Sequence, residues 1–113
     1  MKLLVIVLTD REKLDEALGA LLELDVTSGT VIDTEGMAQV LAAEIPIFAG
    51  LRQLITEPRA SSKTILALSP HNDIVSRMQE LLKETGTDFS KPGTGVMFSI
   101  TVDDVIGGED ALP

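Results

Sequence analysis

Near the end of the chain lies a short loop with the composition of an anion-binding site. Residues 91–95 are Lys-Pro-Gly-Thr-Gly, which places a cation, a hydroxyl group and two glycines in five successive positions. Glycines allow a tight turn whose backbone N–H groups converge on one ligand, and the Lys91 ammonium and Thr94 hydroxyl would stand beside them. Short glycine motifs are also common as plain turns before strands. The residues alone therefore leave two interpretations open, an anion cradle or a connecting turn.

Few other residues have the types and spacing of a catalytic or metal site. The single histidine, His71, lies two residues before Asp73, but this stretch has the composition of a capped helix start. Acidic residues at positions 103–110 lie in an expected frayed tail, which rarely offers the convergent oxygens that a divalent cation needs. The absence of cysteine excludes thiolate ligands and disulfides. With no nucleophile–base pair at a recognisable spacing, we expect neither an enzyme nor a metal site.

Composition limits the partners of the chain. Its 113 residues carry a formal net charge of −9 and their 9 basic residues form no cluster, which argues against nucleic-acid binding. The apolar run at residues 3–8 is short for a signal peptide, and no run approaches the roughly 18 apolar residues of a membrane span. We therefore expect a cytoplasmic protein without membrane insertion. The length suits one domain, assigned to residues 1–107, with an acidic tail at residues 108–113.

The first half of the chain predicts a strand, a helix and a second strand. Residues 3–8 are continuously apolar and rich in branched side chains, which favours a central strand. Apolar residues between positions 14 and 22 then recur at helical spacing, and Asp10 stands before them as a suitable N-cap. Residues 26–34 are rich in β-branched types and predict the second strand.

The second half begins with a long excursion and then repeats the strand–helix pattern. Residues 37–50 are briefly helical in pattern and then extended, and long excursions of this kind are often functional. Residues 63–69 predict a third strand. Residues 72–85 predict a second helix, which Asn72 or Asp73 would cap and Gly86 would end.

The last strand completes a recognisable element order. Val96, Phe98 and Ile100 alternate with other residues, which predicts that this apolar side of the strand is buried. The order strand, helix, strand, excursion, strand, helix, strand favours an α+β fold of the ferredoxin-like βαββαβ type, an antiparallel sheet with two helices on one face. The second face of such a sheet needs cover, and a partner subunit would supply it.

Several pieces of the chain follow one another in an order and spacing that resemble a known family. They are residues 2–7, residues 21–33 with Gly36 after them, residues 47–50, residues 63–68, and KPGTGVMF at residues 91–98. In this order they resemble the PII-like signal-transduction proteins, which include the nitrogen regulatory protein PII, over residues 1–107. No single piece is specific, so the combination carries the resemblance.

The resemblance implies a homotrimer whose sheets face inward and whose three inter-subunit clefts bind ATP or ADP. Family members contact phosphates through a glycine-rich loop before the last strand, and they contact a regulated enzyme or transporter through a long excursion, the T-loop. Nucleotide or anion binding would fall to Thr30, Gly36, Lys91, Gly93, Thr94 and Gly95. The partner loop would be residues 37–49, including Met37, Gln39, Glu44, Ile47 and Phe48. From its residue type we expect Met97 to be a packing residue, and in a trimer it would face the interior.

The chain also departs from the family pattern. It has no tyrosine, which excludes the tyrosine modification that signalling members carry on the T-loop. Val96 stands where the family usually has a basic residue, and residues 105–108 stand where two arginines would clamp phosphates. Each lost charge-assisted contact is worth roughly 1.5–3 kcal/mol. Weak nucleotide binding, a smaller ligand such as AMP or ADP, and no nucleotide at all stay open, and the alternative function is that of a CutA-like metal-tolerance trimer on the same fold.

Overall fold

The computed structural model describes residues 1–44 and 62–108, and of residues 42–44 it describes the backbone alone. In chain order the elements are β1 (Lys2–Leu8), a 3₁₀ turn (Arg11–Lys13), α1 (Leu14–Glu23), β2 (Thr30–Thr34), α2 (Met37–Glu44), β3 (Ser62–Ser69), α3 (Ile74–Glu84) and β4 (Gly95–Thr101). The four predicted strands and the two predicted helices are therefore present. The bounds of β2 differ most from the prediction.

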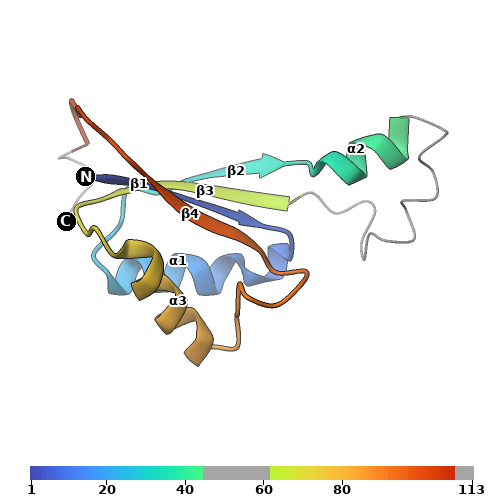
Figure 1. The fold of residues 1–113 in the computed structure, drawn as a ribbon, viewed down its shortest axis with the longest axis horizontal. Helices are drawn as coiled ribbons and strands as arrows, with labels where there is room; N and C mark the ends of the chain where they lie inside the picture. Colours follow the sequence, from blue (N-terminus) through green and yellow to red (C-terminus); the bar gives the residue numbers. More distant parts are fainter. Residues whose placement is uncertain (45–61, 109–113) are drawn as a thin grey trace.

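One antiparallel sheet with the strand order β2-β3-β1-β4 forms the centre of the domain. Helices α1 and α3 cover one face of this sheet, while α2 projects past the end of β2 and away from the other two helices (Figure 1). The predicted α+β class and the antiparallel sheet are confirmed. Helix α2 is an addition to the two predicted helices, and it lies where the sequence predicts an excursion with a brief helical pattern.

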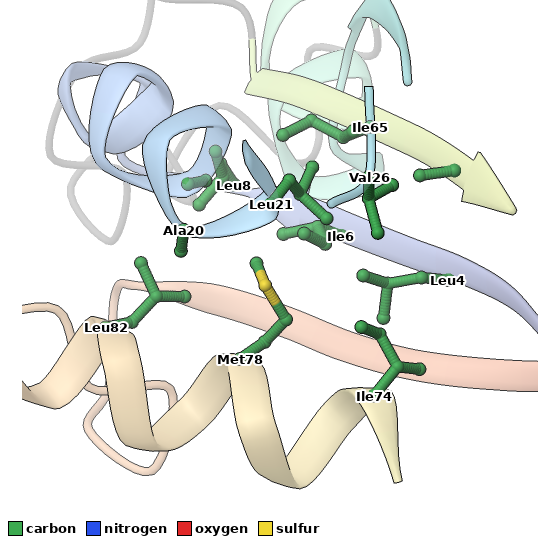
Figure 2. Packing of buried hydrophobic residues seen from close by; sticks show 12 residues of the cluster. Leu4, Ile6, Leu8, Ala20, Leu21, Val26, Ile65, Ile74, Met78 and Leu82 are labelled. Carbon is green, nitrogen blue, oxygen red and sulfur yellow. The ribbon is translucent and has the colours of Figure 1, made fainter. Parts of the chain in front are cut away.

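The core lies between the sheet and helices α1 and α3. Leu4, Ile6 and Leu8 alternate along β1 and are fully buried, and they pack in one cluster with Leu21 of α1 and Met78 of α3 (Figure 2). Burying an aliphatic side chain of this size stabilises the fold by about 1.5–3 kcal/mol. This cluster fixes both helices against the sheet, so residues on α3 are rigidly placed relative to the strands.

Strand β2 begins later than the sequence predicts. Helix α1 ends in a Schellman motif, in which the Val26 N–H donates to the Leu21 carbonyl at 2.9 Å and Asp25 adopts a φ of 60°. The turn carries the Val26 side chain into the buried cluster between sheet and helices. The paired part of β2 consequently starts at Thr30. The prediction of a strand over residues 26–34 is therefore wrong for its first four residues.

Helix α3 has the predicted position but a different start. Asp73 precedes its first residue, yet the Asp73 carboxylate makes no capping hydrogen bond and instead pairs with the Arg77 guanidinium at 3.0 Å. At the other end Gly86, with a φ of 92°, terminates the helix as predicted. There the Thr87 N–H donates to the Leu82 carbonyl at 2.9 Å, again in a Schellman arrangement.

The apolar side of β4 faces away from the helices, contrary to the prediction. Val96, Phe98 and Ile100 are 51%, 41% and 50% exposed, whereas Met97 between them packs against the buried cluster. Met97 therefore belongs to the core of its own chain, and the prediction that it faces the interior of a trimer is wrong. Directly paired residues of neighbouring strands share a face. The helix-free face, called the open face below, thus carries Leu3, Val5, Val7, Ile32, Leu66, Leu68, Val96, Phe98 and Ile100.

Candidate functional site

The loop that leads into β4 starts with a turn built around Asp88. Its carboxylate accepts hydrogen bonds from the Ser90 backbone N–H at 2.9 Å and from the Ser90 hydroxyl at 2.6 Å. The Lys91 N–H then donates to the Asp88 carbonyl at 3.1 Å. An aspartate that bonds to the backbone two residues later is a local turn former, and here it sets the direction in which the loop leaves residue 88.

Gln79 of α3 joins this turn to the helix layer. Its side-chain amide donates to the Asp88 carboxylate at 2.9 Å, and its amide oxygen accepts from the Phe89 N–H at 3.4 Å. Hydrogen bonds from the Ser90 hydroxyl, the Ser90 N–H and Gln79 lower the pKa of Asp88 to about 2. The carboxylate therefore stays charged at every pH of physiological interest.

The far end of the loop is fixed by strand β1. Thr94 accepts a hydrogen bond at its carbonyl from the Thr9 N–H at 3.0 Å. Gly95 has a φ of 135°, and a Cβ placed on it would lie 1.9 Å from the Val7 carbonyl oxygen. No side chain fits there, so close strand pairing by itself requires this glycine. Gly93 has a φ of 87° and open space around it, so its glycine serves the turn conformation.

Between these fixed ends, the loop presents Lys91, Pro92 and Gly93 to solvent. The exposed tip thus combines one cation with backbone N–H groups in a turn that a positive-φ glycine allows. A small anion is the ligand that this chemistry suits. No bound group is needed to explain the positions of Thr94 and Gly95, because strand β1 already accounts for them.

The other two predicted binding residues, Thr30 on β2 and Gly36 just after it, have different surroundings from the loop at residues 91–95. Thr30 is exposed at the start of β2 and lies on the open face, opposite Leu66 of β3. Gly36 precedes the first residue of α2, and its N–H donates to the Gln39 side-chain oxygen at 2.9 Å. The Gly36 carbonyl accepts from the Val40 N–H at 3.1 Å. This is the backward half of a capping box, so Gly36 and Gln39 start helix α2.

Gly36 and the loop at residues 91–95 lie at one end of the sheet but at opposite edges. Thr30 lies farther along β2, in the row of paired residues that runs through Leu66, Val5 and Phe98. A single row of paired residues crosses the sheet through Asp33, Lys63, Leu8 and Gly95. The end of β2 and the start of β4 therefore share one end of the sheet, and strands β3 and β1 separate them. Three strand spacings amount to about 14 Å. One chain does not bring Thr30 and Gly36 together with the loop at residues 91–95.

The predicted partner loop begins as a helix rather than as an irregular excursion. Met37 is exposed at the start of α2, and Gln39 is partly buried. Glu44 is the last residue of α2. Ile47 and Phe48 lie outside the described residues.

A cluster of three hydroxyls at the base of α2 was not singled out by sequence pattern. The Thr34 hydroxyl lies 3.0 Å from that of Ser62 and 2.9 Å from that of Thr64, and the Ser62 hydroxyl also donates to the Thr34 carbonyl at 3.0 Å. Ser62 and Thr64 are buried. The cluster joins the end of β2 to the start of β3, which fixes the point from which α2 departs.

His71 and Asp73 are the sequence candidates for catalysis, and the described structure shows what each of them contacts. The backbone N–H of His71 donates to the Ser69 hydroxyl at 3.1 Å. A hydrogen bond from the Arg77 side chain lowers the pKa of Asp73. Across residues 1–44 and 62–108, no three His, Asp or Glu side chains gather in a way that could hold a metal ion. In the same ranges, no helix has the length and apolar content needed to cross a membrane.

A scan against protein-family models and a search of curated proteins each found no match. The geometry of the loop, of helix α2 and of the open face is thus what bears on function.

Proposed function

We propose that this chain is a PII-like regulatory module: a ferredoxin-like domain that assembles into a cytoplasmic homotrimer and binds a small anion, with ADP or AMP as candidates, between subunits. The observation that carries the proposal is the placement of the candidate binding residues. Gly36 and the loop at residues 91–95 lie at one end of the sheet on its two opposite edges, Thr30 lies farther along the β2 edge, and an apolar face lies between the edges. A second copy is needed to make one cleft from the two halves.

The open face supports self-association. Three large side chains of β4, Val96, Phe98 and Ile100, are about half exposed there. Contiguous apolar patches on a soluble domain mark interaction sites, because leaving them in water costs free energy in proportion to their area. Identical copies offer one another the same apolar surface, and closed assemblies of identical subunits are the common solution.

The opposite edges support a cleft between subunits. When open faces meet around a symmetry axis, the β2 edge of one copy can approach the β4 edge of the next. Thr30 and Gly36 would then come from one subunit and Lys91 and Gly93 from its neighbour. In this arrangement the exposed tip of the loop supplies the anion contact, while Gly95 keeps its role in strand pairing.

The charge balance favours a ligand with few negative charges. Lys91 is the single cation between residues 88 and 96, and the chain has a formal net charge of −9. Each additional phosphate would need a further cation or donor to offset its repulsion from an acidic protein. A mono- or diphosphate is therefore a better match than a triphosphate.

Helix α2 could couple ligand binding in the cleft to contact with a regulated partner. Two residues separate it from the end of β2, and its first turn is organised by Gly36, one of the candidate binding residues. A ligand that contacts Gly36 would compete with the Gln39 side chain for the same N–H. Ligand binding would in that way shift the population of the α2 start, which a regulated enzyme or transporter could sense.

The test combines oligomeric state with ligand binding. Light scattering after size exclusion should give a trimer, and calorimetry with ATP, ADP, AMP and phosphate, with and without Mg²⁺, should show heat for at least one of them. Phe98→Lys should give monomers that lose binding. Leu22→Lys places the same charge on a leucine that is 63% exposed on the helix side, and it should leave both properties unchanged.

A strictly monomeric wild-type protein would contradict the proposal, as would a trimer that binds none of these anions. Metal analysis of untagged protein separates the CutA-like alternative, which requires a bound metal ion.

A further inference from the structure

We infer that Gln79 of α3 is the positioning residue that sets the ligand-binding conformation of the loop at residues 88–95. The inference rests on the proposed function, in which the exposed tip of this loop contacts the anion. A residue on helix α3, outside the cleft, would thereby control the orientation of the loop tip.

Both ends of the Gln79 amide are engaged by the same turn. The nitrogen donates to the Asp88 carboxylate at 2.9 Å, and the oxygen accepts from the Phe89 N–H at 3.4 Å. A primary amide can donate and accept at once, whereas a carboxylate can only accept and an aliphatic side chain can do neither. The position therefore makes use of the specific chemistry of glutamine.

The Asp88 carboxylate links Gln79 to the loop backbone through shared hydrogen bonds. The oxygen that accepts from Gln79 also accepts from the N–H and the hydroxyl of Ser90. The next N–H, that of Lys91, is turned back onto the Asp88 carbonyl at 3.1 Å. Rotation of the Asp88 side chain would thus change the direction of the backbone at the cation that the proposed ligand meets.

The framework on both sides of Asp88 is rigid, because the Thr87 N–H donates to the Leu82 carbonyl and Phe89 packs against the buried cluster. Met78, next to Gln79, is fully buried between α3 and the sheet. The far end of the loop is held by the pairing of Gly95 with Leu8 and by the Thr9–Thr94 hydrogen bond. Gln79 therefore connects a fixed helix to the one end of the loop that strand pairing does not fix.

The test uses Gln79→Glu, because the introduced carboxyl group makes the contact pH-dependent. At pH 7.5 it is a carboxylate facing the Asp88 carboxylate, which stays charged because its pKa is about 2. When two carboxylates share a site, the pKa of one of them is strongly raised, and since Asp88 keeps its low pKa the introduced group is the one that takes up a proton by pH 5. Once protonated, it can again donate to Asp88 and accept from Phe89. Lys83, also on α3, is a further charged group that acts on Asp88, and its charge lowers the pKa of Asp88.

Calorimetry with ADP should show a Kd for Gln79→Glu that is about tenfold above that of wild type at pH 7.5 and within about twofold of it at pH 5. Each comparison is made with wild type at the same pH, which cancels the titration of ADP itself. Gln79→Met should lose about the same affinity at both pH values. Ser76→Glu adds a carboxyl group to an exposed position of the same helix and should bind like wild type throughout.

Amide hydrogen exchange without ligand provides the second measurement. Exchange at Ser90 and Lys91 should be faster in Gln79→Glu than in wild type at pH 7.5, and the difference should disappear at pH 5. Unchanged affinity at pH 7.5, or a loss that persists at pH 5, overturns the inference alone. A wild-type protein that binds neither ADP, AMP, ATP nor phosphate overturns the proposed function and the role of Gln79 together.

Discussion

At the scale of single residues, Gly95 has a role that does not depend on any ligand. Its backbone lies so close to β1 that a Cβ would sit 1.9 Å from the Val7 carbonyl oxygen, at a φ of 135°. We expect Gly95→Ala to lower the free energy of unfolding by more than about 2 kcal/mol, since the clash and the backbone strain add. Urea unfolding at one fixed protein concentration measures the change.

The matched control is Gly19→Ala on α1. No atom lies within 4 Å of a Cβ built on Gly19, and the residue is inside a helix. This substitution should raise the free energy of unfolding by about 0.5–1 kcal/mol, because alanine is the better helix former. Equal stability of Gly95→Ala and wild type would contradict the packing role assigned to Gly95.

Asp88 gives the domain a stability that depends on pH. Its pKa in the folded chain is about 2, below the ordinary aspartate value of 3.8. A depressed pKa contributes stability that is present above the unfolded pKa and is lost as the pH falls through the folded pKa. We expect the stability difference between wild type and Asp88→Asn to be constant above about pH 5 and to shrink between pH 4 and pH 2. Thermal unfolding across this range provides the measurement, and a difference independent of pH would contradict it.

The sequence located the exposed loop more easily than it assigned a structural role to each residue in and around the loop. The composition of residues 91–95 directs attention to a loop that is indeed exposed at its tip. The structural roles of Gly36 and Gly95 depend on Gln39 and on Val7, which meet them only after the backbone has folded. Asp88 and Ser90 have the spacing of a side-chain turn and could have been found by it. The participation of Gln79 has no such signal, because it lies nine residues away on another element.

At the scale of elements, the spacing of apolar residues correctly predicted that these strands and helices are present. It predicted poorly which side of an element is buried. Strand β1 and helices α1 and α3 carry long apolar patterns, and each is present. Alternation in β4 correctly separates Val96, Phe98 and Ile100 from Met97. It does not say which side the helices cover, and both sides of this strand are partly apolar. Strand β2 started late because the Schellman turn after α1 directs Val26 to the core, and its αL residue, Asp25, is not a glycine.

That same residue offers a test of the turn between α1 and β2. Asp25 occupies the left-handed region with a φ of 60°, a conformation that costs a non-glycine residue free energy. Asp25→Gly should raise the free energy of unfolding by about 0.5–1 kcal/mol, since glycine is the usual residue at this helix end. Chemical denaturation beside wild type measures it. Lower stability of the variant would show that the Asp25 side chain contributes more than its backbone strain costs.

At the scale of the whole molecule, the proposed association through the open face predicts that stability depends on protein concentration. Folded subunits that associate through Phe98 and its neighbours are stabilised by mass action, whereas unfolded chains are not. Raising the wild-type concentration about a hundredfold should raise Tm by about 5 °C or more. Calorimetric scans of Phe98→Lys should give a Tm that does not change with concentration. A constant wild-type Tm would count against association through this face.

The order of the strands in the sheet also sets when the domain can form during synthesis. Central strand β1 is the first to leave the ribosome, and its two neighbours β3 and β4 are made much later. The backbone bond from Val102 N–H to the Met1 carbonyl likewise joins residues that are made about a hundred positions apart. An emerging chain consequently holds its most apolar strand without partners until β3 appears, and it cannot close the β1–β4 pair until residue 101 is free of the exit tunnel. The topology of this fold therefore delays closure of the sheet until nearly the whole domain has been made.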